Sequence, residues 1–301
     1  MFLKIATFVI ISLLMTKTAV SAEKVIYEKN SLYQYIVVTE DKSRGERYVY
    51  NSRSEGIHGG IKLSSPETLL FEYTQMAFIG LAFMDKLPAN ALFIGLGAGS
   101  MPKYFNKYFP DAAIDMVEVD PEMLHVAQKF FYFKENEKMK IHIFDGRVFI
   151  KKFPRKYDMI FLDAFRNGAI PFHLTTVEFL EELKKRLNPG GLVVSNILSR
   201  FNNQFFDSMV VTYQKAFENL YIFRGRNSYN YAFVAAMQRK HINPSEIVKR
   251  TKAVQSAKGL NIDLSSIAAN YDYTSNTKDS SADILTDDFA PAIRYLYGEA
   301  L

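Results

Sequence analysis

The sequence contains no cysteine and no tryptophan among its 301 residues. Without cysteine it cannot form disulfide bonds, a thiolate nucleophile or a zinc site with cysteine ligands. With no tryptophan, the 25 Phe and 18 Tyr supply the large side chains of the expected core. No metal is expected either, because no two of the five histidines pair at metal-ligand spacing: His58, His125, His142, His173 and His241.

An excess of positive charge is also small. Lys and Arg exceed Asp and Glu by 37 to 32, a net charge of +5. Two of these charges, Lys4 and Lys17, belong to a leader that we expect to be removed, which leaves +3 (5 − 2). No stripe of Lys and Arg interleaved with aromatic residues occurs, so no nucleic-acid partner is expected. With 48% hydrophobic and 23% charged residues, the chain has a globular rather than a disordered composition.

The N-terminus carries a short hydrophobic run. Lys4 precedes the apolar residues Ile5–Met15, and Val20-Ser21-Ala22 offers the small residues that a signal peptidase reads. This pattern predicts a signal peptide over 1–22, cleaved after Ala22, and export, to a bacterial periplasm. The run is shorter than a membrane span needs. An uncleaved leader that attaches the protein to a membrane stays an alternative.

Residues 23–64 are expected to form a small N-terminal β domain. The segment Leu32–Val38 is rich in aromatic and β-branched residues, and Arg47–Tyr50 resembles it. The turn cluster Asp41–Gly45 lies between them, so the pair predicts a β-hairpin. Another turn is expected at Gly56–Gly60.

The remaining residues, 65–301, are expected to form a larger domain. It opens with helical periodicity over 66–84 and then alternates buried strands with helices. Strands are predicted at 91–95, 114–119, 141–144, 159–162, 192–197, 220–223 and 231–237, and helices at 121–133, 146–152, 176–187 and 202–219. This order predicts an α/β fold, a seven-stranded, doubly wound, Rossmann-like sheet of the class I methyltransferase type. The polar segment 240–280 is expected to be a flexible excursion before a last helix.

A glycine-rich turn follows the first buried strand. The sequence Gly95-Leu-Gly97-Ala-Gly99 precedes a helix, and its glycines let the backbone turn tightly and approach a ligand. Ser100 stands where the dinucleotide-binding pattern wants Gly or Ala, so the spacing favours the methyltransferase form. Taken alone, the turn could also join strand and helix without binding anything.

Acidic residues follow the next two strands. Glu118 lies 19 residues beyond Gly99, where a carboxylate can accept both ribose hydroxyls, and Asp145 ends the third strand, facing an adenine amino group. The alternatives are a helix N-terminal charge for Glu118 and an N-cap for Asp145. Because all these features fall at one sheet edge, they predict a nucleoside site. Its expected residues are Gly95, Gly97, Gly99, Glu118, Asp145 and Gly146.

The fourth strand ends in Asp163, after the apolar run Tyr157–Leu162. A carboxylate at this edge would face the sulfonium side of a bound nucleoside, where it can orient an amine and accept its proton. The alternative is a helix or loop cap. The loop Arg166–Thr176 follows, and loops at this edge commonly act as lids.

Several motifs together carry a family resemblance. They are Ser31–Gln34, Tyr73–Met76, the glycine turn, Glu118, Asp145-Gly146, Asp163, Ile170–Thr176, Pro189–Gly191 and Leu285–Pro291. With these, the chain resembles the spermidine synthases (polyamine aminopropyltransferases), and most of all a divergent bacterial branch of that family. The resemblance implies that Asp163 is the catalytic base and that the glycine turn, Glu118, Asp145 and Gly146 bind the donor. It implies that the substrate-binding residues include Gln34, His58, Tyr73 and Gln75.

The implied reaction is the attack of an amine such as putrescine on the aminopropyl carbon of decarboxylated S-adenosylmethionine. Three positions depart from the family pattern. Ala98 and Arg166 replace aspartates, and Gln75 stands where Glu is common. A diamine is doubly positive, and one close charge pair of the wrong sign costs about 1 to 4 kcal/mol.

Two other functions stay open. Ala98 leaves no acid to anchor a decarboxylated donor, which favours a methyltransferase that uses S-adenosylmethionine. Export away from the cytosolic donor, together with the missing acids, favours a catalytically inactive protein that binds a nucleoside or a partner. His58 and His173 can equally be ordinary polar positions. A homodimer is compatible with the sequence.

Overall fold

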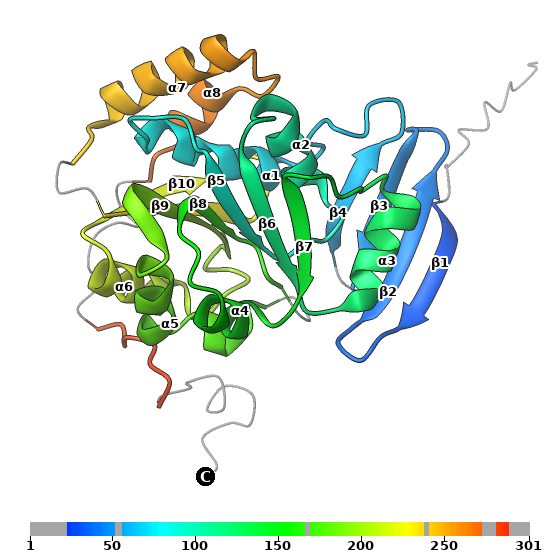
Figure 1. Cartoon of the computed structure of the whole chain (residues 1–301), viewed down its shortest axis with the longest axis horizontal. Helices are drawn as coiled ribbons and strands as arrows, with labels where there is room; N and C mark the ends of the chain where they lie inside the picture. Colours follow the sequence, from blue (N-terminus) through cyan, green and yellow to red (C-terminus); the bar gives the residue numbers. More distant parts are fainter. Residues whose placement is uncertain (1–22, 52–55, 166–168, 238–240, 273–280, 289–301) are drawn as a thin grey trace, which may run out of the picture.

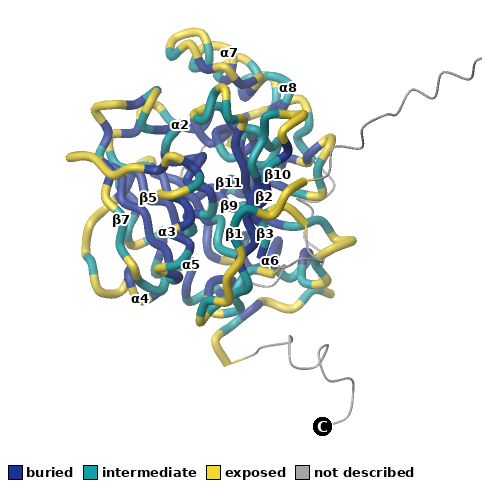
Figure 2. The backbone as a smooth tube through the Cα atoms, turned by 90° about the vertical axis from the view of Figure 1, so that its right-hand side faces the viewer, coloured by how far each residue is buried: buried dark blue, intermediate teal, exposed yellow. Residues whose placement is uncertain are grey.

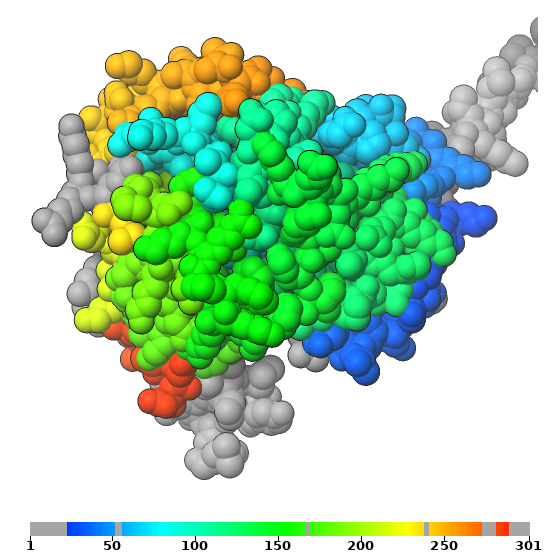
Figure 3. Space-filling model, viewed as in Figure 1, coloured from blue at the N-terminus to red at the C-terminus, as the bar shows by residue number. Residues whose placement is uncertain are grey.

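The computed structural model describes residues 23–51, 56–165, 169–237, 241–272 and 281–288. Within them, a four-stranded sheet lies beside a seven-stranded sheet that is covered by helices (Figure 1). The two parts adjoin in the space-filling view, where the blue N-terminal strands meet the green surface of α3 (Pro121–Phe130) (Figure 3). The leader 1–22, Arg166 and the predicted last helix lie outside the described residues.

The N-terminal sheet is antiparallel, with the order β1-β2-β3-β4. Its strands are β1 (Lys24–Asn30), β2 (Tyr35–Asp41), β3 (Glu46–Tyr50) and β4 (Ile57–Lys62). The predicted hairpin is confirmed by β2 and β3, in which Val38 pairs with Val49. The turn expected at Gly56–Gly60 is wrong, because Gly59 and Gly60 lie inside β4. A Cβ atom at Gly60 would lie 2.7 Å from the Arg47 carbonyl oxygen, so glycine serves close strand approach there.

The larger sheet has the order β10-β11-β9-β8-β5-β6-β7, and all seven predicted strands are present. They are β5 (Asn90–Ile94), β6 (Ala113–Glu118), β7 (Met139–Ile143), β8 (Tyr157–Leu162), β9 (Leu187–Leu198), β10 (Asn219–Arg224) and β11 (Asn230–Ala236). The strand β11 runs antiparallel to both of its neighbours, which makes the sheet mixed. Strand β5 lies between β6 and β8, so the chain reverses its direction of winding there, where open sheets bind ligands.

Helices cover both faces of this sheet. One buried cluster forms with α4 (Gly146–Lys152), α5 (Val177–Lys184) and α6 (Phe206–Ala216), and the other with α2 (Ser100–Tyr108) and the two C-terminal helices. A short 3-10 turn, η2 (Phe172–Leu174), precedes α5. Side chains of Asp120, Asp145 and Thr176 cap α3, α4 and α5 by accepting backbone N–H groups. The strands of the large sheet other than its edge strand β7 are mostly buried (Figure 2).

Two helical predictions need correction. Residues 66–84 do not form one helix but the short α1 (Glu72–Met76) and the 3-10 helix η1 (Ala77–Phe83). Six of the seven η1 residues are buried. Gly80 packs directly on the sheet, because a Cβ atom added there would lie 2.5 Å from Met159 Cε. The amphipathic pattern therefore predicted one helix that is longer than either α1 or η1.

The flexible excursion over 240–280 is also wrong for its described part. It contains α7 (Pro244–Lys258) and α8 (Leu264–Ala268). Asn243 caps α7, and Gly259 ends it in the left-handed conformation. Only Ile247 and Thr251 of α7 are buried, so the polar composition of this surface helix hid its periodicity.

A third buried cluster joins the two sheets. Ile36, Val38 and Val49 of the small sheet pack on Ala98 of the glycine turn and on Met123 and Val126 of α3. This packing holds β4 against the glycine turn, and so forms one wall of the site. The domain boundary after residue 64 stays a prediction. None of the helices in the described ranges is long and apolar enough to cross a membrane.

Candidate functional site

A cavity of about 1500 Å³ opens at the carboxyl edge of β5, β6, β8 and β9. Its walls come from the glycine turn, β4, α1, η2, α8 and the turn between β10 and β11. All predicted donor-site residues except Gly99 line it, as do Asp163 and the four predicted substrate-binding residues. The topology therefore brings together side chains that are spread along the chain from Tyr33 to Ile267.

The three glycines of the turn have different roles. All have positive φ: 102° at Gly95, 53° at Gly97 and 65° at Gly99. A Cβ atom at Gly95 would lie 2.2 Å from the Asp163 carbonyl oxygen, and one at Gly99 would lie 2.8 Å from a core ring. At Gly97 the nearest atom, the His58 carbonyl oxygen, is 3.8 Å away. Packing of the protein itself thus explains Gly95 and Gly99, whereas Gly97 leaves open space for a ligand to approach the backbone.

Glu118 stabilises the glycine turn by hydrogen bonding. Its Oε2 accepts the Leu96 N–H at 3.1 Å, and its Oε1 accepts the Asp120 N–H at 2.9 Å. Burial raises the pKa of Glu118 to about 6. The cap of α3 is Asp120, so Glu118 is not needed as the helix cap. Each carboxylate oxygen has a second lone pair, which can accept a ribose hydroxyl from the cavity.

Asp145 combines both roles weighed for it. Its Oδ1 caps α4 by accepting the N–H groups of Arg147 and Val148 at 2.9 and 3.0 Å. Its Oδ2 lies 2.7 Å from His173 Nε2, and this contact is the main cause that lowers the pKa of Asp145. Gly146 is buried, with 2.6 Å between a hypothetical Cβ and a side chain of β5. The Asp145–His173 pair therefore forms the end of the cavity where an adenine amino group was expected.

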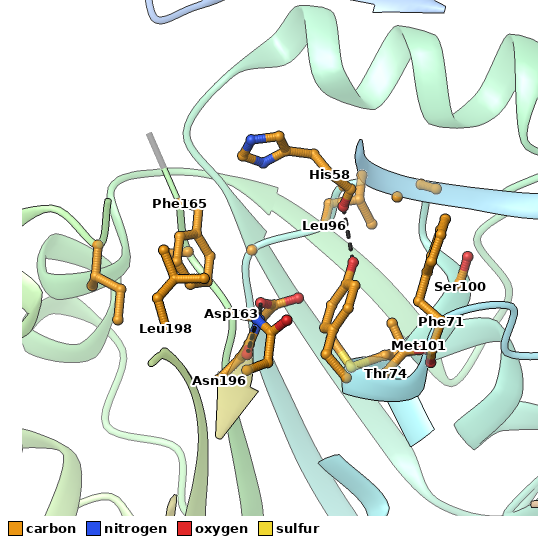
Figure 4. Close-up of a pocket in the computed structure, with 18 of the residues that line it drawn as sticks. His58, Phe71, Thr74, Leu96, Ser100, Met101, Asp163, Phe165, Asn196 and Leu198 are labelled. Atoms are coloured by element: carbon orange, nitrogen blue, oxygen red, sulfur yellow. Dashed lines mark hydrogen bonds between the residues drawn. The ribbon is translucent and has the colours of Figure 1, made fainter. Parts of the chain in front are cut away.

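Asp163 lies on the floor of the cavity, after β8. Asn196 of β9 donates from Nδ2 to Asp163 Oδ1 at 2.8 Å, and both side chains face the centre of the cavity (Figure 4). Loss of contact with bulk water raises the pKa of Asp163 to about 7, against the lowering effect of the Asn196 bond. The N-cap positions of the elements that follow in the described chain, η2 and α5, are occupied by Pro171 and Thr176, so Asp163 is not a helix cap.

Tyr73 and His58 hold each other on the opposite wall. The Tyr73 hydroxyl donates to the His58 carbonyl oxygen at 2.9 Å, which ties α1 to β4. Burial and the nearby charge of Asp163 raise the pKa of Tyr73 well above its usual value. The ring atom Nδ1 of His58 lies 3.0 Å from Asn51 Nδ2. Asn51 is buried, and its Oδ1 has no hydrogen-bond partner among the described residues.

The two predicted glutamines are more peripheral. Gln75 donates from Nε2 to the Leu69 carbonyl oxygen at 2.9 Å, which stabilises the chain before α1. Gln34 Nε2 lies 3.5 Å from Asp120 Oδ2. Both side chains still line the cavity, so the structure places them with the other candidates without assigning them a ligand.

The departure at Ala98 has a structural counterpart. Ala98 is buried against β4, 3.1 Å from the position of a Cβ at Gly59, and it packs into the hydrophobic cluster between the two sheets. The carboxylate of Asp287 pairs with Arg147 at 2.7 Å, away from Ala98. Among the described residues, no group of three or more His, Asp or Glu side chains is placed to hold a metal ion.

Sequence reasoning missed Asn196 and Asn230. Asn196 interrupts the apolar run of β9, one residue beyond Ser195, which pairs with Leu162. A polar residue at that position lies beside Asp163 at the sheet edge. The place of Asn196 near the end of a predicted buried strand was therefore the feature of the sequence that could have identified it. Asn230 gave no such signal, because it reaches the site only through the pairing of β11 with β9.

Comparison with known proteins gives three informative similarities. A polyamine aminopropyltransferase of Vibrio vulnificus is 31% identical over 291 residues, covering 95% of this chain and 96% of the relative. The structure of a probable spermidine synthase from Corynebacterium glutamicum has a TM-score of 0.68 at 22% identity, covering 89% and 98% of the two chains. Human methyltransferase-like protein 13 in complex with SAH has a TM-score of 0.58 at 27% identity, covering 63% and 93%.

These similarities agree with the geometry of the site. At 22% identity the Corynebacterium structure supports the fold alone, and it supports the class I methyltransferase-like architecture predicted from the sequence. The sequence profile of the spermine/spermidine synthase domain matches residues 70–241, which is more than half of the chain and includes the glycine turn, Glu118, Asp145 and Asp163. Together with the nearly full-length Vibrio relative, this match shows that the chain belongs to the spermine/spermidine synthase family.

Proposed function

We propose that this protein is an aminopropyltransferase that moves the aminopropyl group of decarboxylated S-adenosylmethionine to an amine such as putrescine. The observation that carries the proposal is the carboxylate of Asp163, which faces the same cavity as the glycine turn, Glu118 and Asp145. Family membership and the name of the Vibrio relative support the reaction class.

The donor is expected to lie along the edge of β5, β6 and β7. Its backbone contact would be at Gly97, where space is open, and its ribose hydroxyls would bond to Glu118. The adenine amino group would meet Asp145, whose Oδ2 either accepts a second hydrogen bond or exchanges its contact with His173. The SAH in the complex of methyltransferase-like protein 13 supports an adenosyl ligand of this kind.

The chemistry asks little of the protein beyond positioning. The acceptor nitrogen forms a bond to the aminopropyl carbon, that carbon loses its bond to sulfur, and methylthioadenosine leaves. The proton that the nitrogen sheds passes to Asp163. A carboxyl group with a pKa of about 7 can accept a proton near neutral pH and release it after product departure. The protein must also hold both reactants in line and exclude water.

The direct test is product analysis with the purified protein. Decarboxylated S-adenosylmethionine and putrescine are supplied, and spermidine and methylthioadenosine are measured by mass spectrometry. We expect both products in equal amounts, and Asp163→Asn should reduce the rate at least a hundredfold while the affinity for methylthioadenosine is kept. Donor binding without any aminopropyl product from a panel of amines contradicts the proposal.

A second candidate is a methyltransferase that uses intact S-adenosylmethionine. The apolar surroundings of Ala98 favour it, because a decarboxylated donor finds no acid there for its amine. The 27% identity to methyltransferase-like protein 13 adds support. The same assay with S-adenosylmethionine, in which S-adenosylhomocysteine is measured, separates the two reactions. If neither donor nor methylthioadenosine binds, a catalytically inactive protein remains.

We further propose that residues 1–22 direct export, with cleavage after Ala22. The apolar run after Lys4 and the small residues before the cleavage point support this proposal. The mass of the protein recovered from the periplasm tests it, because a chain that starts at Glu23 differs clearly from one that keeps the leader. Native mass spectrometry of the same sample tests whether the protein is a homodimer.

A further inference from the structure

Two asparagine amides connect Asp163 to the last strand pair of the sheet. Asn196 Nδ2 donates to Asp163 Oδ1 at 2.8 Å, and Asn230 Nδ2 donates to Asn196 Oδ1 at 2.9 Å. The backbone sets this row, since β9 and β11 pair antiparallel with Asn196 opposite Ala232 and Asn230 opposite Leu198. Both amides line the cavity on the Asp163 side. The three side chains therefore form one line of hydrogen bonds along the cavity floor.

The hydrogen bonds in this line all run the same way, from donor to acceptor, toward Asp163. An asparagine amide carries two donors on nitrogen and acceptors on oxygen, and it can turn over to exchange the two. If Asn196 turned over, its oxygen would face the oxygen of an ionised Asp163, and its nitrogen would face the donor of Asn230. The donation from Asn230 disfavours this arrangement, because it engages the Asn196 oxygen and keeps the NH₂ group pointing at Asp163. A donor aimed at a carboxyl group favours the ionised form.

We infer that Asn196, oriented by Asn230, is a positioning residue that presents Asp163 to the acceptor amine as a carboxylate with Oδ1 occupied and Oδ2 directed to the substrate. The role rests on the proposed function of Asp163 as proton acceptor. Asn196 touches Asp163, and Asn230 acts only through Asn196. The pair thus orients the reacting group and, against the effect of burial, favours its ionised form.

The other charged groups that line the cavity in the described part of the chain have partners of their own: Asp145 pairs with His173, Arg226 donates to Asn270, and Asp263 accepts from Ser266. Glu72 of α1 accepts the backbone N–H groups of Arg226 and Asn227 at 2.8 and 2.7 Å. Glu118 bonds to backbone N–H groups on the far side of the glycine turn. The Tyr73 hydroxyl is the titratable group of α1 that feels the charge of Asp163, and its raised pKa keeps it neutral. Asn196 is therefore the side chain whose hydrogen bond opposes the effect of burial on the ionisation of Asp163.

The test is the titration of the Asp163 carboxyl group, followed by ¹³C NMR on the full chain and assigned with Asp163→Asn. Asn196→Ala removes the donor, so the midpoint should rise by about one pH unit. Asn230→Ala should raise it by a smaller amount. Because Asn230 acts through Asn196, adding Asn230→Ala to Asn196→Ala should change nothing further.

A matched control exists on the same strand. Asn188 of β9 also donates from Nδ2 to an aspartate, Asp158, at 2.7 Å, but it lies outside the cavity. Asn188→Ala makes the same chemical change and should leave the Asp163 midpoint where it is. The acid limb of the pH profile of kcat/KM for aminopropyl transfer should follow the NMR midpoint in each variant.

An unmoved midpoint in Asn196→Ala, or a full additional shift from Asn230→Ala in the double variant, overturns the inference. If Asn196→Ala does not fold, Asn230→Ala alone decides, since the Asn230 side chain is only half-buried at the start of β11. The NMR midpoint needs no substrate. A failure of the proposed reaction would therefore appear as absent turnover with a normal midpoint shift, which distinguishes it from a failure of the amide pair.

Discussion

Asp163 is a residue whose chemistry works against stability. Its pKa in the folded protein is about 7, above the ordinary value of 3.8, so between these values the folded state binds more protons than the unfolded state. The unfolding free energy therefore falls as pH rises from 4 to 7 and is level above that. Asp163→Asn removes this slope and should stabilise the protein by about 2 kcal/mol at pH 8, after allowance for contact with the cavity.

Urea unfolding of both proteins between pH 4 and pH 8 measures this effect. The advantage of the asparagine variant should vanish at the acid end of the range and reach its full size near neutrality. A stability difference that does not change with pH would show that Asp163 is not held in a desolvated environment.

Gly97 and Gly95 separate ligand contact from packing at the level of single residues. Gly97→Ala meets open space, so the protein should fold with a loss of about 1 kcal/mol from the left-handed backbone conformation. The added methyl group points into the donor space and should weaken methylthioadenosine binding by about tenfold or more. Gly95→Ala would collide with the Asp163 carbonyl oxygen and should fail to fold stably.

Thermal melting and calorimetric titration of the two variants test this contrast. Unchanged methylthioadenosine affinity in a folded Gly97→Ala protein would place the donor elsewhere.

At the scale of elements, the C-terminal segment Leu285–Asp288 is held against α4 and α5. The Asp287 carboxylate bonds to Arg147 at 2.7 Å and to the Thr176 hydroxyl, while Leu285 is buried. Arg147 also pairs with Glu182 at 2.9 Å and donates to the His173 carbonyl oxygen. One guanidinium therefore connects the C-terminal segment to the end of the cavity.

This arrangement predicts unequal effects for its two charges. Arg147→Ala leaves two carboxylates without their shared partner and should lower the unfolding free energy by about 3 kcal/mol. Asp287→Ala should cost about 1 kcal/mol, because Asp287 is 41% exposed and Arg147 keeps Glu182. Chemical denaturation of both variants checks the order, and equal losses would contradict it.

The elements that could be predicted from the sequence are those whose apolar residues follow a single regular pattern. Buried strands of the large sheet appear as continuous apolar runs, and the acids after them identify the sheet edge. The helix α7 was not predicted because it buries only two side chains. The single helix predicted over 66–84 was too long, because the buried residues of η1 are not confined to one face and do not show the period of an α-helix. In β4, glycines that permit close strand approach were mistaken for a turn.

At the scale of the whole molecule, the two sheets share one buried cluster. Val38 and Val49 of the small sheet are fully buried against Met123 and Val126 of α3. The sequence could not predict this contact, because pairing between distant segments leaves no local period. The contact matters for the site, since it holds His58 of β4 and the glycine turn next to each other in one wall of the cavity.

Val38→Ala should therefore destabilise both sheets together, by about 1 to 3 kcal/mol. Differential scanning calorimetry should show a single transition that moves to lower temperature. A variant in which the small sheet melts separately, before the large sheet, would show that the two parts do not share a core.

Gly97, Glu118, Asp145 and Asp163 surround one cavity, which we propose binds the adenosyl group of the donor. Isothermal titration calorimetry of the purified protein with methylthioadenosine tests it most directly. We predict one site per chain, with affinity lowered at least tenfold in Glu118→Ala and Gly97→Ala and kept in Asp163→Asn. The absence of binding heat over a range of temperatures, or equal affinity in all four proteins, would contradict it.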